Sequence, residues 1–413
     1  MKKAATALFS VVIAAGLIWA GLFYWKNLRG IGPALGPPPA DIVDLIERTG
    51  QSEASDSEPL PRPKNEVPFP LTLPVGFSIS VFAKDLPGVR VMKLDALGNM
   101  WVSQTSEGII TLLEIQDGVV TNQYSSFRNL RKPHGLAFDP DNPQVLYIAE
   151  EDKISRVATY ADGSLEKIID LPKDGGHFTR TIGFGPDGRL YVSVGSSCNV
   201  CHESDARRAR IFTIDDDGGG LRPFARGLRN SVFFAWHPET EKLWATDMGR
   251  DLLGDDVPPD EINIIEEGKN YGWPVCYGKN IHDTDFDKSI YKRNPCMEPF
   301  ETGSAIDVPA HSAPLGLAFI PATPAWPEEY WHDLIVAYHG SWNRSTPTGY
   351  KLVRFRLDQR GNIEDAEDFV SGWLTPAGAL GRPVDILVTP EGAMYVSDDK
   401  AGVIYEIRPR LNT

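Results

Sequence analysis

The stretch from His177 to Gly195, HFTRTIGFGPDGRLYVSVG, contains two apolar strands joined by the turn Pro186-Asp187-Gly188. Glycine suits such a turn because it adopts positive φ without steric cost. Five other stretches have the same plan, beginning at Val89, Lys132, Arg229, Ser312 and Gly381. Self-similarity with a period of roughly 45 residues is typical of propeller blades. The six copies therefore predict an all-β fold, a six-bladed β-propeller over residues 69–413.

Most copies have a charged or polar side chain just before the first strand. These residues are Arg90, His134, His177, Arg229 with Asn230, His311 with Ser312, and Arg382. In a propeller such positions surround one mouth of the central channel. A ring of arginine and histidine is costly to remove from water unless something binds it. The pattern predicts a binding site at this mouth.

Composition and the spacing of the repeats limit which partners and which domain organisation are expected. The hydrophobic content of 42% supports a sizeable core, and the net charge of −15 argues against a nucleic-acid partner. Residues 251–311 interrupt the repeat between the fourth and fifth copies, and long insertions at a propeller mouth usually shape a binding site. The alternating segment FSISVFA, which begins at Phe77, is expected to pair with VIYEI near the C-terminus and close the ring.

The first 30 residues are expected to be a membrane anchor or a signal segment. Ala4 to Trp25 contains no charged residue, and this length can cross a bilayer as a helix. A cleaved signal peptide is the alternative. Lys2 and Lys3 favour a cytoplasmic N-terminus. Both interpretations place the propeller in the periplasm, held at a bacterial inner membrane by a single transmembrane helix or released by cleavage. Residues 31–68, rich in Pro, Ser and Glu, are expected to be a linker.

The four cysteines suggest two disulfides in an oxidising compartment. Cys276 and Cys296 would close a loop within the insertion. Cys198 and Cys201 would form a tight local bond. The letters CNVCH from Cys198 also spell a c-type haem attachment motif, but no helical stretch surrounds them. Free thiols remain a third possibility for this pair.

The strongest local signal is a set of motifs in the fourth repeat and the insertion. They are Arg229-Asn230, Asp247-Met248-Gly249-Arg250, Asp260-Glu261-Ile262-Asn263 and Asn270-Tyr271-Gly272-Trp273-Pro274. Together with His177 ahead of GFGPDG, they resemble the glucose/sorbosone dehydrogenase family of quinoproteins, which use pyrroloquinoline quinone (PQQ). The resemblance covers roughly residues 70–410.

The resemblance implies PQQ at the channel mouth, calcium beside it, and oxidation of aldose sugars or sorbosone-like hydroxy-aldehydes. The residues it implies for cofactor binding are Arg229, Asn230, Asp260, Arg382, Met248 and Arg344. Met248 stands where a family member has Gln, and Arg344 is the nearest counterpart of a family Lys. Main-chain oxygens of Gly249 and Arg250 match the calcium positions, although the family has Pro in place of Arg250.

His177 matches the catalytic base of the family. Oxidation of a hydroxyl-bearing carbon removes a proton from O–H while hydride leaves the carbon, and a histidine suits that role. A channel histidine with no role is the alternative for His177. His134 holds the equivalent place in the second repeat, where substrate or cofactor contact is less favoured than a structural role. A quinone or a small redox carrier would accept the electrons.

Two other functions are compatible with a propeller. A calcium-dependent lactonase or esterase would need carboxylates and amides converging on an axial metal, whereas the positions before the strands are mainly His and Arg. A non-enzymatic binding scaffold would leave the charged ring without a ligand. Nicotinamide use is not expected, because no Gly-x-Gly-x-x-Gly opens a helix after a strand.

Overall fold

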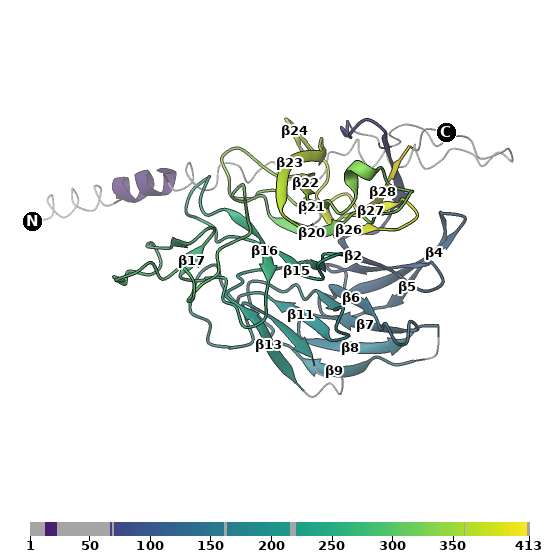
Figure 1. Cartoon of the computed structure of the whole chain (residues 1–413), viewed down its shortest axis with the longest axis horizontal. Coiled ribbons are helices and arrows are strands. Elements are labelled where there is room, and N and C mark those ends of the chain that lie inside the picture. Colours follow the sequence, from purple (N-terminus) through teal and green to yellow (C-terminus); the bar gives the residue numbers. More distant parts are fainter. Residues whose placement is uncertain are drawn as a thin grey trace, which may run out of the picture.

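The computed structural model describes residues 13–22, 67, 70–160, 163–214, 220–358 and 360–410. Six antiparallel sheets of four strands each make up the fold (Figure 1). One strand from each sheet lines a shared central cavity, so the sheets are the blades of a propeller. The predicted six-bladed, all-β architecture is confirmed.

The strands fall into four sets by their place in the blade. The innermost strands are β2 (Val89–Leu94), β6 (Gly135–Phe138), β10 (Ile182–Phe184), β14 (Phe234–Trp236), β20 (Pro314–Phe319) and β26 (Pro383–Val388). The second strands are β3 (Met100–Gln104), β7 (Val145–Ala149), β11 (Leu190–Val194), β15 (Leu243–Asp247), β21 (Leu334–Tyr338) and β27 (Met394–Asp398). The third strands are β4 (Ile109–Gln116), β8 (Lys153–Ala158), β12 (Arg210–Ile214), β16 (Asp260–Ile265), β22 (Lys351–Leu357) and β28 (Val403–Pro409). The outermost strands are β5 (Val119–Phe127), β9 (Glu166–Asp170), β13 (Leu221–Arg226), β19 (Ile306–Val308), β23 (Ile363–Val370) and β1 (Phe77–Ala83).

The two ends of the described propeller meet in the sixth blade. Its strand order is β1-β28-β27-β26, so an N-terminal strand is the outer edge of a sheet made from the C-terminus. Phe77 pairs with Pro409 and Val81 with Tyr405. This pairing confirms the expected closure of the ring, which leaves no open seam between the first and last blades.

Burial changes from the axis to the rim of each blade. All five residues of β3, β11 and β27 are buried, because each sheet packs against a neighbour on both faces. The rim strand β23 is exposed over its first six residues. Apolar second strands and polar rim strands therefore follow from where each strand lies in the blade.

The insertion adds a small hairpin and completes the fourth blade. The remaining elements are β17 (Cys276–Tyr277), β18 (Ile281–His282), β24 (Leu374–Thr375), β25 (Gly378–Ala379) and η1 (Glu328–Tyr330). Disulfides join Cys276 to Cys296 and Cys198 to Cys201, as the disulfide interpretation predicted. The two sulfurs of the CNVCH motif are bonded to each other, which argues against the haem interpretation.

The N-terminal prediction falls mostly outside the described residues. Residues 13–22 form a helix, drawn in purple in Figure 1. Within the described ranges, no helix has the length and apolar character that crossing a bilayer requires. The rest of the segment from Ala4 to Trp25, and the expected linker apart from Val67, lie outside the described residues. Anchor and linker therefore stay predictions.

Candidate functional site

Loops that precede the inner strands bring four of the predicted site residues to one end of the channel, namely His177, Arg229, Asn230 and Arg382. His177 and Asn230 flank Gly195, where a Cβ atom would lie 2.7 Å from both the Asn230 Oδ1 and the His177 Cβ. Only glycine allows this close approach. His134 and Arg382 directly precede their inner strands, and Ser312 lies two residues before β20, as predicted. His177 and Arg229 lie five residues before β10 and β14, and Arg90 lies within β2.

Arg229 is a buried arginine, with 5% of its surface exposed. Its Nε donates to the Asn199 carbonyl and its Nη2 to the Asn199 Oδ1, both at 2.8 Å. The Nη2 also pairs with Asp251 Oδ2 at 3.1 Å, and Nη1 donates to the Met248 carbonyl at 3.3 Å. These contacts hold the planar guanidinium in one orientation. Burial lowers the pKa of Arg229.

Asn199 and Asp251 are site residues that sequence reasoning did not single out. Asn199 lies between the bonded Cys198 and Cys201, and its Oδ1 also accepts from the Asp251 backbone N–H at 2.8 Å. Asp251 in turn accepts from the Asn343 side chain at 3.1 Å. A short disulfide loop of the third blade therefore supports an arginine of the fourth. The only sequence signal was an amide placed between two closely spaced cysteines.

His177 is fixed through its Nδ1, which lies 2.9 Å from both the carbonyl and the hydroxyl oxygen of Ser196. The Ser196 hydroxyl donates to the Cys198 carbonyl at 2.8 Å. If Nδ1 carries the proton and donates to the Ser196 carbonyl, Nε2 is left with a free lone pair. Burial, and then the charge of Arg229, lower the pKa of His177 to about 3. The imidazole is therefore neutral at physiological pH and able to accept a proton.

Asp247 and Asp260 organise the backbone beneath these side chains. Asp247 accepts from the backbone N–H groups of Arg229 at 2.9 Å and Asn230 at 2.6 Å. Asp260 accepts from the N–H groups of Gly249 and Ala313, both at 2.8 Å. Burial raises the pKa of Asp260 to about 7. The structure therefore gives Asp260 a role in holding two loops, beside its predicted role in cofactor binding.

Met248, Gly249 and Arg250 follow β15 in the same small cleft as Arg229. The Asn230 amide lies 3.5 Å from the Met248 sulfur. A Cβ at Gly249 would lie 2.6 Å from the Pro259 carbonyl, so this turn requires glycine. Arg250 pairs with the buried Asp283 of the insertion at 2.8 Å. The Arg250 side chain is thus turned toward the insertion loop.

Arg382 belongs to a second charged group at the same end, built from the fifth and sixth blades. Its guanidinium donates to the carbonyls of His339 at 3.0 Å and Gly340 at 2.6 Å. Asp399 joins this group by pairing with Arg90 at 2.6 Å and His339 at 2.9 Å. The loop that carries His339 also carries Asn343, which contacts Asp251. One loop thus connects the Arg382 group to the Arg229 group.

Two predicted residues lie apart from these groups. Arg344 pairs with Asp256 at 2.7 Å and donates to the carbonyls of Asp255 and Ala310. His134 is fully buried, with its ring 5.3 Å from that of Phe233. The structure favours the structural role for His134, because its side chain is closed off from solvent.

The surroundings of His177 carry an excess of buried positive charge, which fits an anionic ligand. Arg229, Arg180 and Arg208 all act to lower the pKa of His177. Within the described part of the chain, buried nitrogens without a hydrogen-bond partner include Arg180 Nε and Arg208 Nη1 near His177, and Arg90 Nε in the Arg382 group. Unpaired buried guanidinium donors are costly unless an anion meets them. The carboxylates of PQQ are groups of this kind.

A metal ion would need other ligands than the guanidinium groups that suit an anion. Among the described residues, potential side-chain ligands come together in a group of three at one place, Cys198, Cys201 and Glu203, where both sulfurs are in a disulfide. At Gly249 and Arg250, the described residues thus provide no group of three carboxylates close enough to share one ion. A calcium ion there would depend on main-chain and cofactor oxygens, as the resemblance implies.

Fold and site together define a six-bladed propeller with a cationic, histidine-bearing channel mouth. The profile of the TrAA12-like family matches residues 71–410. The chain belongs to this family, which confirms the family resemblance found in the sequence. An uncharacterised protein of Borreliella burgdorferi is 32% identical over 362 residues, covering 83% of this chain and 92% of that protein.

Two further matches have names that state a cofactor or a metal. The pyrroloquinoline quinone-dependent pyranose dehydrogenase of Coprinopsis cinerea is 22% identical to this chain. The match covers 81% of this chain and 54% of that protein. A calcium structure of the Trichoderma reesei carbohydrate-active enzyme family AA12 superposes with a TM-score of 0.70 at 19% identity, covering 83% of this chain and 98% of that one. At this identity, the structural match supports the fold alone.

Proposed function

We propose that this protein oxidises aldose sugars or sorbosone-like hydroxy-aldehydes by hydride transfer to PQQ at the cationic mouth. The observation that carries the proposal is the pair formed by a neutral, anchored His177 and a buried, oriented Arg229. Family membership and the names of the matched dehydrogenases agree with it.

The arginines of the mouth would hold the cofactor. Arg229 and Arg382 have guanidinium planes fixed by carbonyl acceptors, so little side-chain entropy would be lost on meeting a carboxylate. Asn230 and Met248 would contact the ring system beside them. PQQ, when bound, supplies the hydride acceptor. Arg344 remains the weakest of the proposed contacts, because its guanidinium already contacts Asp255 and Asp256.

His177 would remove the proton of the reacting hydroxyl. Its Nδ1 is engaged by Ser196, so Nε2 is the atom left to accept that proton. A group that is already neutral needs no prior deprotonation. The positive charge of Arg229 and Arg180 also favours an alkoxide as it develops on the substrate.

The same proposal includes a calcium ion, the cellular location of the protein and its electron acceptor. We place calcium at the carbonyls of Gly249 and Arg250, beside the cofactor oxygens. We place the propeller in the periplasm, held at the inner membrane by the apolar N-terminal segment or released from it. A quinone or a small redox carrier would take the electrons.

The proposal is tested by titrating the apo-protein with PQQ, with and without calcium, while the absorption spectrum is recorded. A panel of aldoses and hydroxy-aldehydes is then assayed with an artificial dye as acceptor. We expect saturable PQQ binding and dye reduction with at least one aldose. Absence of PQQ binding, or full turnover with NAD in chelator, would contradict the proposal.

A further inference from the structure

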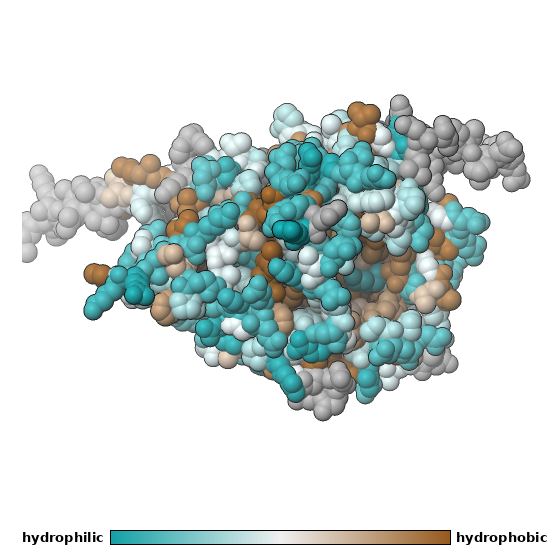
Figure 2. Space-filling model, viewed as in Figure 1, coloured by the Kyte–Doolittle hydropathy of each residue, from teal (hydrophilic) through white to brown (hydrophobic). Residues whose placement is uncertain are grey.

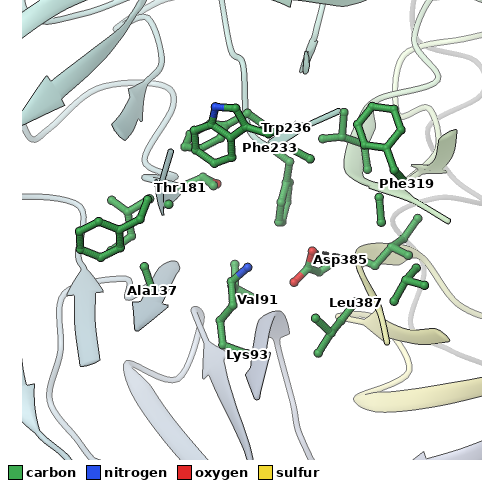
Figure 3. Close-up of a pocket in the computed structure, with 18 of the residues that line it drawn as sticks. Val91, Lys93, Ala137, Thr181, Phe233, Trp236, Phe319, Asp385 and Leu387 are labelled. Atoms are coloured by element: carbon green, nitrogen blue, oxygen red, sulfur yellow. Dashed lines mark hydrogen bonds between the residues drawn. The ribbon is translucent and has the colours of Figure 1, made fainter. Parts of the chain in front are cut away.

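The central channel contains a cavity of about 580 Å³ that the proposed reaction does not use. All six inner strands contribute to it (Figure 3). Its volume falls in the range of small-molecule sites, which are typically about 300–1,000 Å³. The cavity is therefore large enough for a compound of one or two fused rings.

This cavity lies at the other end of the channel from the cationic mouth. Lys93, Phe138, Phe184 and Trp236 line it from the ends of their strands. In contrast, His177, Arg229 and Arg382 precede inner strands. Met248 follows β15, whose Ala245 pairs with Phe234 at the start of β14. The last residue of every inner strand lines the cavity, so the six strands run in the same direction along the axis: these residues are Leu94, Phe138, Phe184, Trp236, Phe319 and Val388.

Buried residues line the cavity on the side of the mouth. Thr181 and Phe233 directly precede β10 and β14 and are almost fully buried. The Thr181 hydroxyl donates to the Val232 carbonyl, and the ring of the fully buried His134 lies 5.3 Å from that of Phe233. None of the residues of the mouth lines the cavity, so a ligand there would be held by a different set of side chains.

The walls of the cavity are aromatic and are held in place from outside. Figure 3 shows Phe233, Trp236 and Phe319 around an open centre. The ring of Trp236 lies 5.5 Å from that of Phe234 and 5.3 Å from that of Tyr191, both edge to face. Phe319 packs in the same way on Trp244 at 5.8 Å. Rings fixed like this present preformed faces and edges to a flat ligand.

Two opposite charges enter this apolar space without pairing. Figure 3 shows the Lys93 nitrogen and the Asp385 oxygens pointing toward the open centre. Within the described residues, the side chain of Lys93 makes no hydrogen bond and no ion pair within 4.0 Å. Asp385 is 7% exposed, and each of its oxygens accepts one backbone N–H, from Met92 and from Ile386, at 2.9 Å.

These two side chains define what a ligand must offer. A carboxylate has about four acceptor positions, so Asp385 keeps acceptor capacity toward the cavity, and Lys93 keeps three donors. The two charges cancel, which favours a ligand without net charge. A ring with one edge oxygen that accepts from Lys93 and another edge hydroxyl that donates to Asp385 would satisfy both.

We propose that the channel cavity is a second small-molecule site, which binds an uncharged, flat aromatic ring carrying hydroxyl groups at two separate edges. The rings of Phe138, Phe233, Trp236 and Phe319 enclose the body of the ligand. Lys93 and Asp385 bind its two oxygens. The site is independent of the proposed dehydrogenase function, since none of the residues of the mouth contributes to it.

The test is isothermal titration of the apo-protein with 2,6-dihydroxynaphthalene, which is flat and uncharged at neutral pH. We expect saturable binding with one molecule per chain. 2,6-Dimethoxynaphthalene has the same ring but no hydroxyl donor and should bind at least tenfold more weakly. Lack of saturation up to the solubility limit, or equal binding of both compounds, would overturn the proposal.

Variants then locate the binding. Lys93→Met should weaken binding by about ten- to a hundredfold, because a hydrogen bond to a charged donor is lost. Phe138→Leu should weaken it by several-fold at most, through reduced ring contact. Lys279→Met changes an exposed lysine of the insertion and should bind like the parent protein. Equal binding by the Lys93 and Lys279 variants would place the probe elsewhere.

A competition experiment separates this site from the cationic mouth. Saturating the protein with PQQ and calcium should leave the affinity for 2,6-dihydroxynaphthalene unchanged, because the cavity and the mouth are lined by different residues. Competitive displacement would put the probe at the mouth and would overturn the proposal. Failure of PQQ itself to bind would contradict the proposed dehydrogenase function and leave the naphthalene titration unaffected.

Discussion

The two ends of the channel are lined by the same six blades but by different chemistry. At the mouth, Arg229, Arg382 and His177 are oriented by backbone carbonyls and carboxylates. At the cavity, aromatic rings dominate, and Lys93 with Asp385 supplies the charge. Figure 2 shows the hydrophilic surface of one face, with apolar side chains gathered in its recesses.

The difference arises from which part of the chain reaches the axis. The mouth is formed by loops, both those before the inner strands and those after the second strands β15, β21 and β27. Loops accept varied polar residues because their backbone does not have to form the hydrogen bonds of a sheet. The cavity is formed by the strands themselves, whose residues alternate between the axis and the packed interior. A propeller can therefore vary its loop residues for chemistry at one end while its strands shape the other end.

The largest effect is expected from removing the histidine of the mouth. His177→Ala should lower kcat by about 10²–10⁴-fold, because the general base is lost, while PQQ binding stays nearly intact. Steady-state kinetics with a dye acceptor measure kcat, and an absorption titration measures PQQ binding. His282→Ala, in the insertion, is the control and should stay within twofold of the parent. A His177→Ala enzyme with parental kcat would move the base elsewhere.

A somewhat smaller effect is expected from Arg229→Lys. The positive charge is retained, but the planar donors to Asn199, Asp251 and the cofactor are not. Affinity for PQQ should fall by about ten- to a hundredfold. A PQQ titration at fixed calcium and low salt measures it. Unchanged half-saturation would show that Arg229 lies away from the cofactor.

Asn199→Ala tests whether the disulfide loop positions that arginine. The variant removes the amide oxygen that accepts from Arg229 and from the Asp251 backbone, and it should lower the free energy of unfolding by about 1–3 kcal/mol. PQQ affinity should fall by less than in Arg229→Lys. Urea denaturation and PQQ titration measure the two effects. Asn122→Ala, on the exposed strand β5, is the matched control; equal behaviour of both variants would remove the positioning role.

The smallest effect is expected from changing pH around His177. With its pKa lowered to about 3, the folded protein leaves His177 neutral above that pH, whereas the unfolded chain binds a proton near 6.5. The unfolded state therefore gains a proton as pH falls from 6.5 toward 3, and this residue destabilises the fold over that range. Nitrogen NMR of the apo-protein should show one neutral tautomer, protonated at Nδ1, from pH 8 to 5. A titration midpoint near 6.5 would contradict the buried, cation-rich environment.

Much of the fold could be predicted because its information is local. The repeated strand-turn-strand stretches, the alternating Phe77 segment and the spacing of the cysteines can each be recognised within a few residues. The predicted closure between β1 and β28 and both disulfides are present in the structure.

The site could be predicted only in part, because its contacts join different blades. Arg229 was recognisable from its motif, but Asn199, Asp251 and Asn343 come from three separate loops and carry no periodic signal. His134 shows that a similar position in two repeats can also mislead. The sequence suggested the same place in its repeat as His177, yet His134 directly precedes β6, whereas His177 lies five residues before β10. His134 is therefore buried against Phe233. The aromatic walls of the cavity look like ordinary core residues in the sequence.

Ring closure through β1 has a practical consequence for attachment. Phe77 and Pro409 are paired neighbours at the outer edge of the sixth blade. Three strands, β28, β27 and the innermost β26, lie between β1 and the axis. A surface, tag or fusion partner joined at either end of the propeller would therefore be held at the same point on the rim. The two openings of the channel lie at the ends of the axis and not on the rim, so an immobilised protein would present each end of the channel to solution.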